Sequence, residues 1–143
     1  MNFKSNYLSF ADDLKIFNKI KDNRDRDNIQ HDLNVLNHWC SKNKLSLNIS
    51  KCKHVAFSNK LNPFHANYSI NGNILEKVET INDLEVIMDS RLKFSSHIVN
   101  ITRKAHRTLG FIIRQTGSFT KLNCINLLYN ALVRPTLEYA CSI

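Results

Sequence analysis

The hydrophobic periodicity of the chain changes near residue 93, and this change limits the folds that it can adopt. Before that point, short apolar runs separated by polar breaks are typical of β-strands and tight turns around one helix. After it, Ile98, Ala105 and Ile112 recur on one stripe of a helix. A second helical pattern follows and is expected to end at Pro135. The sequence therefore predicts an α+β fold with a helical tail.

Two apolar runs near the start, residues 7–10 and 14–17, flank the polar break Ala11-Asp12-Asp13. Aromatic and β-branched residues on both sides of such a break predict a β-hairpin. Asp suits the turn because its carboxylate accepts hydrogen bonds from nearby backbone N–H groups. A helix capped by Asp12 is the alternative, since so few residues do not define a period. At the tip of a hairpin the two carboxylates would offer hard oxygen ligands to Mg²⁺.

An amphipathic helix is expected after the charged break at residues 22–28. Its apolar stripe consists of Ile29, Leu33, Leu36, Trp39 and Cys40. Polar residues such as Gln30 and Asp32 lie off this stripe, and the helix is expected to end near Asn43.

Two short strands are then expected around a basic turn that contains Lys51, because residues 45–49 alternate in polarity and residues 55–57 are apolar. Further along, Asn71-Gly72 stands between apolar runs and predicts a type I′ hairpin turn, since both residues adopt positive φ at little cost. Residues 80–88 form another strand candidate.

Two helices are expected in the tail. The first carries Arg103, Arg107 and Arg114 on the side opposite its apolar stripe and is expected to end at Gly117. The apolar face of the second consists of Leu122, Ile125, Leu128, Tyr129 and Leu132.

The charge of the chain is concentrated in this tail. The net charge is +8, and from Arg91 to Ile143 the only acid is Glu138. Surface helices that form salt bridges normally interleave both signs, so the excess favours a polyanionic partner such as nucleic acid or an acidic membrane surface. A solvated helix face without a partner is the alternative reading. Because each neutralised phosphate releases counterions, nucleic acid is the partner that we expect for this region.

The sequence also bears on cellular location. No apolar run approaches the ~18 residues that a spanning helix needs, and the start lacks the apolar segment of a secretory signal. We therefore expect an intracellular protein, cytoplasmic or nuclear, with no membrane partner. The four cysteines form no C-x-x-C pair, so reduced thiols are expected.

The segment Phe10-Ala11-Asp12-Asp13 resembles the catalytic aromatic-Ala-Asp-Asp hairpin of reverse transcriptases (RNA-directed DNA polymerases), especially those of non-LTR retrotransposons of the jockey type. Three further blocks resemble the same family in the same order. They are a helix and strand at residues 39–53, an Asn-Gly hairpin with a primer-grip-like block at residues 68–92, and a thumb-like region at residues 104–140. The resemblance therefore extends over nearly the whole chain.

This resemblance implies roles for particular residues. Asp12, assisted by Asp13, would coordinate Mg²⁺ (or Mn²⁺), and Lys51 would lie near the phosphates of the incoming deoxynucleotide triphosphate, so these three are the implied catalytic residues. Two further sets are implied, the primer-grip-like residues Leu84, Glu85 and Val86, and the residues along the template–primer backbone, Arg103, Lys104, Arg107 and Arg114. The implied partners are an RNA template and a DNA primer.

Two departures from the family pattern stand out. These polymerases take another metal-binding Asp and a Gly-rich fingers segment from regions upstream of the hairpin, whereas residues 1–11 contain no Asp or Glu. In addition, Glu85 occupies a position where the family has Gly, a residue that permits close backbone approach or a bulge.

The resemblance thus implies a partial polymerase palm followed by an α-helical thumb. Residues 1–60 would be the C-terminal part of the palm, residues 61–92 a connector and primer-grip-like hairpin, and residues 93–143 a basic, truncated thumb. We expect a fragment of a mobile-element polymerase, the product of a truncated copy, that does not catalyse nucleotidyl transfer alone. A non-catalytic nucleic-acid-binding module and a non-functional relic of the element are the alternatives.

Overall fold

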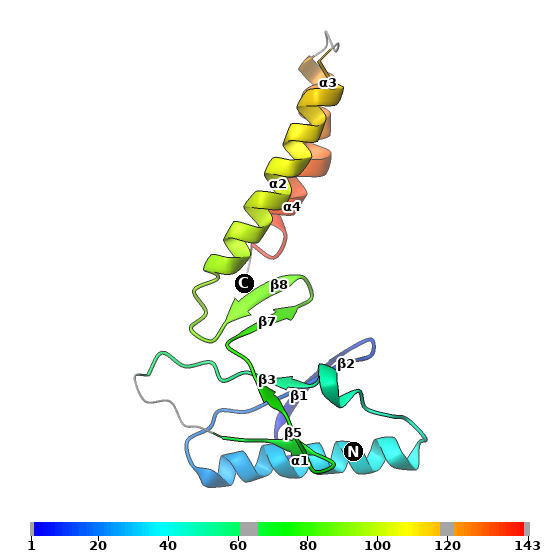
Figure 1. Ribbon diagram of the computed structural model, residues 1–143, viewed down its shortest axis with the longest axis vertical. Helices are drawn as coiled ribbons and strands as arrows, with labels where there is room; N and C mark the ends of the chain where they lie inside the picture. Colours follow the sequence, from blue (N-terminus) through cyan, green and yellow to red (C-terminus); the bar gives the residue numbers. More distant parts are fainter. Residues whose placement is uncertain (1, 61–65, 118–121, 142–143) are drawn as a thin grey trace. The chain divides into compact units, whose positions relative to one another are not determined.

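The computed structural model describes residues 2–60, 66–117 and 122–141. Helices and short strands are mixed in these ranges, so the α+β class is confirmed (Figure 1). The chain divides into two compact units, Met1–Glu79 (unit 1) and Thr80–Ile143 (unit 2). No helix in the described ranges is both long enough and apolar enough to cross a membrane.

Unit 1 begins with the predicted hairpin. Strands β1 (Asn6–Phe10) and β2 (Asp13–Phe17) are antiparallel, with Phe10 opposite Asp13. Ala11 and Asp12 form the turn, and Ala11 has a φ of 51°. A positive φ at the first turn residue matches the right-handed twist of the two strands. The hairpin prediction is confirmed, and the alternative of a helix capped by Asp12 is wrong.

The predicted helix is also present, as α1 (Asn23–Lys42). The side chain of Asp22 caps its first turn by accepting a hydrogen bond from the backbone N–H of Asp25 at 3.1 Å. Asn43 ends the helix at the expected place. Leu33, on its apolar stripe, packs in the core of unit 1, whose other buried members are Tyr68, Ile70 and Leu75. Ile29 and Leu33 therefore have the role that the spacing predicts, whereas Trp39 on the same stripe is 38% exposed.

Asp32 on α1 is fully buried, although it lies off the apolar stripe. Its carboxylate accepts hydrogen bonds from the backbone N–H groups of Lys4 at 2.9 Å and Ser5 at 2.7 Å. A buried carboxylate requires such donors, because an unpaired one would lose its hydration without compensation. Asp32 therefore ties the segment that enters β1 to the middle of α1.

The two strands predicted between residues 45 and 57 are mostly wrong. Residues 45–48 have no regular structure, and Ile49–Lys51 form a 3₁₀ turn, η1. Only β3 (Lys53–His54) is a strand, and it pairs in parallel with β6 (Glu76–Lys77). Alternating polarity produces a strand only where a neighbouring strand supplies ladder hydrogen bonds. Leu47 and Ile49 instead pack against the apolar core of unit 1.

The Asn-Gly hairpin is confirmed. Strands β4 (Ser69–Ile70) and β5 (Asn73–Ile74) are antiparallel, and Asn71 and Gly72 have φ values of 51° and 78°. Two positive φ values are what a type I′ turn requires. The side-chain amide of Gln30 donates to the carbonyl of Ser69 at 2.8 Å and accepts from its N–H at 3.0 Å, which attaches this hairpin to α1.

Unit 2 begins with a third tight hairpin, at a place where one strand is predicted. Strands β7 (Thr80–Asp83) and β8 (Val86–Asp89) are antiparallel. Leu84 and Glu85 form the turn with φ values of 47° and 67°. The prediction of a single strand over residues 80–88 is therefore wrong. The sequence did not indicate this turn, because neither Leu nor Glu is a residue type that usually adopts positive φ.

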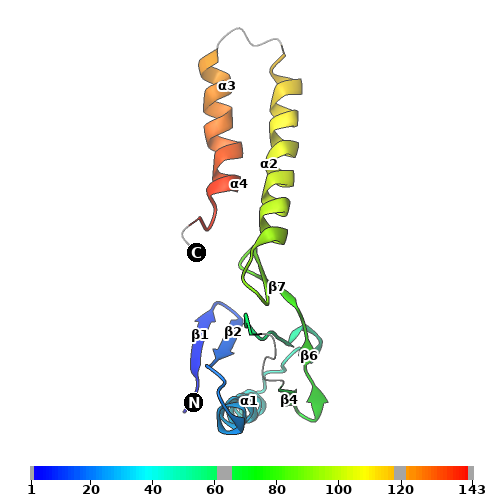
Figure 2. The same cartoon turned by 90° about the vertical axis from the view of Figure 1, so that its left-hand side faces the viewer.

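A pair of antiparallel helical segments follows (Figure 2). Helix α2 (Ser95–Gln115) ends at Thr116, one residue before the predicted Gly117. The returning arm consists of α3 (Leu122–Leu128), the π-helical turn η2 (Tyr129–Val133) and α4 (Arg134–Glu138). The buried residues between the arms are Ala105, Ile112 and Val133, with Leu109 and Leu128 packed against them. We refer to the whole as the helical pair.

The π-helical turn changes which residues of the returning arm face α2. The predicted face continues from Leu128 to Leu132, but Leu132 is 47% exposed and Val133 is buried. A π-turn adds one residue to the helical repeat, so position i+5 replaces position i+4 on the packed face. Pro135 does not end the arm, because it lies in the first turn of α4, where a missing N–H costs little. The parts of the predicted connector and tail at residues 61–65, 118–121 and 142–143 lie outside the described residues.

Candidate functional site

The paired carboxylates lie at the tip of the β1–β2 hairpin. Asp12 is the second turn residue, Asp13 is the first residue of β2, and both are exposed. Within the described part of the chain, neither carboxylate takes part in a hydrogen bond or an ion pair. All of β1 is also exposed, including Phe10 at 61%. The hairpin therefore presents two unpaired acids beside an uncovered strand.

Carboxylate oxygens are the kind of ligand that a hard cation such as Mg²⁺ prefers, but two carboxylates are too few to hold it. Mg²⁺ takes about six oxygen ligands in near-octahedral geometry. In the described ranges, no three His, Cys, Asp or Glu side chains are grouped so that they could hold a metal ion. Asp12 and Asp13 are thus an incomplete donor set by themselves.

Lys51 is the last residue of η1, and its side chain is exposed. Its backbone N–H donates to the carbonyl of Asn48 at 3.0 Å, which closes the 3₁₀ turn. Among the described residues, no hydrogen bond or ion pair joins its ammonium group to Asp12 or Asp13. Its role beside a nucleotide phosphate stays a prediction.

The primer-grip-like residues occupy the turn of the β7–β8 hairpin and the start of β8. The carbonyl oxygen of Leu84 accepts a hydrogen bond from the hydroxyl of Tyr139 at 2.8 Å. The Glu85 carboxylate forms an ion pair with the ammonium group of Lys104 at 3.0 Å. Val86 is buried, at 5% exposure. All three residues therefore have partners or packing inside unit 2.

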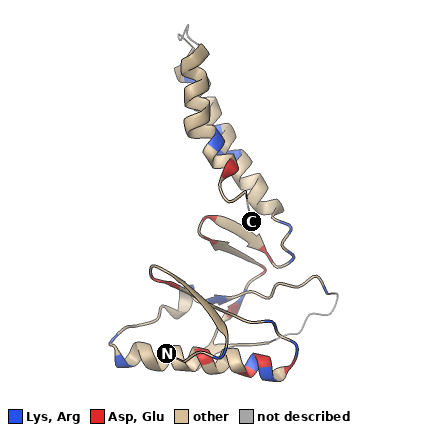
Figure 3. Ribbon diagram, turned by 180° about the vertical axis from the view of Figure 1, so that it is seen from behind, with Lys and Arg blue, Asp and Glu red and all other residues tan. Residues whose placement is uncertain are grey.

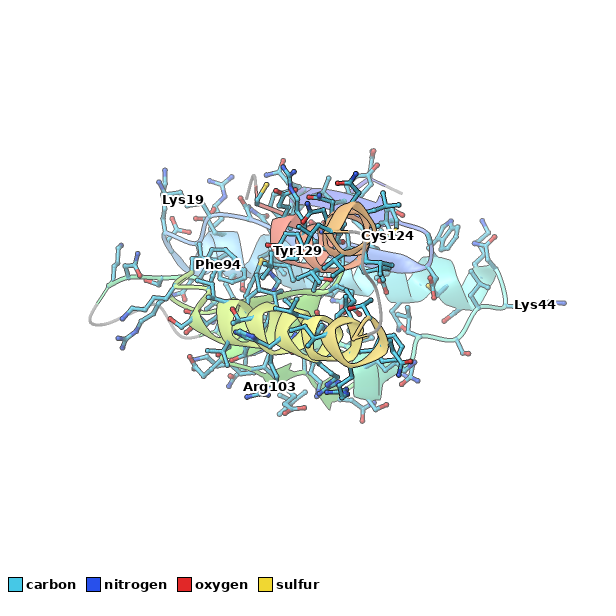
Figure 4. The ribbon with its side chains drawn as sticks, turned by 90° about the horizontal axis from the view of Figure 1, so that it is seen from above. Lys19, Lys44, Phe94, Arg103, Cys124 and Tyr129 are labelled. Carbon is cyan, nitrogen blue, oxygen red and sulfur yellow. The ribbon has the colours of Figure 1, made fainter. Side chains whose placement is uncertain are left out.

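The arginines of α2 form a separate feature, the arginine stripe, made of Arg103, Arg107 and Arg114. Their positions lie within about 40° of one another around the helix axis, and all three are exposed. Figure 4 shows Arg103 on the side of α2 away from Tyr129. In the residues that the structure describes, none of the three has a hydrogen-bond or ion-pair partner.

The charge balance of the helical pair leaves this stripe uncompensated. Glu138, the only acid after residue 90, pairs with Arg134 on its own helix at 2.6 Å. Lys104, predicted to bind nucleic acid with the stripe, lies to one side of it and pairs with Glu85. Figure 3 shows Lys and Arg as most of the charged positions on the helical pair.

Asp89 and His97 position the base of α2, and sequence reasoning identified neither. The Asp89 carboxylate accepts hydrogen bonds from the backbone N–H groups of Arg91, Lys93 and Phe94 at 2.9–3.2 Å. These bonds, the one from Lys93 foremost, lower the pKa of Asp89. His97 is buried, and its Nδ1 accepts from the N–H of Ile87 at 3.3 Å. Asp89 is the last residue of β8, a few residues before α2, and the sequence alone does not show which N–H groups its carboxylate reaches.

The comparisons with known proteins concern nearly the whole chain. It is 26% identical over 140 residues to the RNA-directed DNA polymerase from mobile element jockey of Drosophila melanogaster, and 27% identical over 140 residues to the same-named protein of Drosophila funebris. Each alignment covers 94% of this chain but only 15% of the relative. The chain thus spans a small part of the length of these relatives.

A third relative is an uncharacterised protein of Caenorhabditis elegans, which is 32% identical over 63 residues, 44% of this chain and 31% of the relative. No protein-family model and no solved structure matches the chain. The resemblance that the sequence motifs indicate is nevertheless confirmed, because the chain is similar over 94% of its length to a segment of jockey-type RNA-directed DNA polymerases, the reverse transcriptases of retrotransposons.

Proposed function

We propose that this chain is the palm-and-thumb segment of a jockey-type reverse transcriptase, and that its own activity is binding of the nucleic-acid backbone. The palm would extend over residues 1–60, the connector and primer-grip-like hairpin over residues 61–92, and the thumb over residues 93–143. The order of the motifs and the similarity to the jockey polymerases support this proposal. The arginine stripe is the observation that carries the binding activity.

The geometry of the stripe suits a row of phosphates. Arg103 and Arg114 are eleven residues apart on α2, a rise of about 16 Å, over which one duplex strand presents about five phosphates. Guanidinium groups bind phosphate oxygens through paired N–H donors. Because no acid pairs with these arginines in the described residues, phosphate binding need not break an ion pair. The ligands that we propose are the RNA template and the DNA primer.

Binding is tested by fluorescence anisotropy with a labelled RNA–DNA duplex at several salt concentrations. Three phosphate contacts predict a slope of log K against log salt of about −2.7. The double variant Arg103→Gln plus Arg107→Gln should weaken binding and flatten this slope, whereas Asp12→Ala should leave both unchanged. Equal binding by the wild type and the double arginine variant would refute the proposal.

For the complete polymerase, we propose that Asp12 and Asp13 supply two of the carboxylates that hold Mg²⁺ or Mn²⁺, with Lys51 neutralising charge on the phosphates of the deoxynucleotide triphosphate. Such metal ions activate an attacking hydroxyl and stabilise the leaving oxygen. Because the donor set in this chain is incomplete, we expect no primer extension by the chain alone with either metal. Extension that Asp12→Asn abolishes would contradict this expectation.

A non-catalytic nucleic-acid-binding module is the second candidate, and the same unpaired stripe favours it. The two candidates differ in what a longer polymerase containing this segment should do. Asp12→Asn should abolish extension by such a polymerase if the hairpin is catalytic, and should leave it unchanged if this segment only binds. A third possibility, a relic that folds poorly, predicts a broad and non-cooperative thermal transition.

A further inference from the structure

Glu85 has a backbone conformation that its side chain does not favour. It is the second residue of the β7–β8 turn, with a φ of 67°, a position where Gly is preferred. The turn itself therefore gives no reason for a long acidic side chain there. What the side chain does in this structure is form the ion pair with Lys104 on α2, at 3.0 Å.

This ion pair lies beside the arginine stripe. Lys104 follows Arg103 directly and precedes Arg107 by three residues, and side chains at that spacing on a helix have Cβ atoms about 5–6 Å apart. A nucleic-acid strand bound to the stripe would meet Lys104 as the neighbouring cation on α2, and with it the Glu85 carboxylate that pairs with Lys104. The Glu85 carboxylate is paired with the ammonium group of Lys104, which could otherwise contact a further phosphate.

We propose that Glu85 is an internal competitor for the nucleic-acid backbone, whose carboxylate takes the place of a phosphate on Lys104. This inference rests on the proposed binding by the arginine stripe. Both side chains of the pair are well exposed, at 69% for Glu85 and 49% for Lys104. Exposed ion pairs are weak, so a bound strand displaces the carboxylate only in part and at a small cost in affinity. Glu85 therefore sets how strongly the stripe binds.

The test measures binding of a short labelled single-stranded RNA to the whole chain by fluorescence anisotropy. Glu85→Gln removes the charge and keeps the size of the side chain. Glu76→Gln is the matched control, because Glu76 is also exposed and paired with a lysine, Lys53, but belongs to unit 1. Both variants change the net charge equally, so a difference between them reports the position of the charge.

Glu85→Gln should bind about threefold more tightly than the wild type near 50 mM salt, with a salt slope steeper by about 0.7, the value for one more phosphate contact on a single strand. Glu76→Gln should bind like the wild type. In a Lys104→Gln background, Glu85→Gln should have no effect, because the contested ammonium group is gone. Glu85→Gly should repeat the gain without backbone strain, so poor folding of one variant does not prevent the test.

Two outcomes would overturn the inference: equal affinities for Glu85→Gln and Glu76→Gln, or a full gain in the Lys104→Gln background, which would indicate general repulsion instead of competition for Lys104. A failure of the proposed nucleic-acid binding by the arginine stripe would give a different result. If Arg103→Gln plus Arg107→Gln leaves RNA binding unchanged, the arginine stripe is not the binding site, whatever Glu85→Gln does.

Discussion

The hydroxyl group of Tyr139 donates a hydrogen bond to the carbonyl oxygen of Leu84 across 2.8 Å and 55 residues of sequence. This bond attaches the residue after α4 to the turn of the β7–β8 hairpin. On the other side of the same turn, Glu85 is paired with Lys104 of α2. Both arms of the helical pair therefore fix the position of one tight turn.

Tyr139→Phe should destabilise unit 2 by about 0.5–1.5 kcal/mol, because it removes this hydrogen bond and keeps the ring. Urea denaturation followed by circular dichroism measures the change. Tyr7→Phe is the matched control, since Tyr7 is similarly exposed and its hydroxyl has no partner among the described residues. Equal losses in the two variants would mean that the bond to Leu84 does not stabilise the fold.

Leu84→Asn plus Glu85→Gly should stabilise unit 2. Both positions have positive φ, which costs most side chains about 1 kcal/mol or more and which Asn and Gly tolerate well. The loss of the exposed Glu85–Lys104 pair offsets only about 0–1 kcal/mol of this gain. A rise in the thermal midpoint is the expected readout. Glu85→Gln keeps the backbone strain and serves as the control, with a midpoint at or slightly below that of the wild type.

Asp32→Asn should destabilise unit 1 by about 1.5–3 kcal/mol, the range for hydrogen bonds to a charged group. The carboxylate serves two backbone N–H donors, and an Asn side chain has one acceptor oxygen, so one donor would be left unpaired. Hydrogen exchange should quicken at Lys4 and Ser5, next to β1. Asp27→Asn, an exposed change on the same helix, should alter stability by less than about 0.5 kcal/mol. An Asp32→Asn variant as stable as Asp27→Asn would disprove this anchoring role.

Asp89 should make unit 2 sensitive to acid. Its pKa is lower in the folded chain, because the backbone N–H groups of Lys93, Arg91 and Phe94 stabilise the charged form. Its stabilising contribution is therefore complete above the unfolded pKa, near 4, and is lost as the pH falls through the lower folded pKa.

Unfolding measured between about pH 6 and pH 3 should show this loss in the wild type and a weaker pH dependence in Asp89→Asn. Asp12→Asn, at an exposed turn without a partner in the described residues, should follow the wild type. Parallel pH profiles for the wild type and Asp89→Asn would show that the carboxylate contributes nothing to the start of α2.

Much of the local structure and part of the site could be predicted from the sequence. Asn71-Gly72 forms the tight turn that its residue types indicate, Asp12 lies in the predicted hairpin turn, and Leu33 on the apolar stripe of α1 packs in the core. Such features are encoded within a few neighbouring residues, through turn preferences and helical periodicity. The same locality explains why Asp12 could be placed at a hairpin tip from sequence alone.

Tertiary structure decided the rest. Residues 45–48 lack a strand because no strand in the described part of the chain pairs with them, and Val133 replaces Leu132 on the packed face because of a π-turn. Asp32 is buried only because the backbone of Lys4 and Ser5 lies over it. The pairing of Lys104 with Glu85 likewise depends on residues far apart in sequence. Propensities and periodicity describe one segment at a time, whereas strand pairing, burial and ion pairs require two segments to meet.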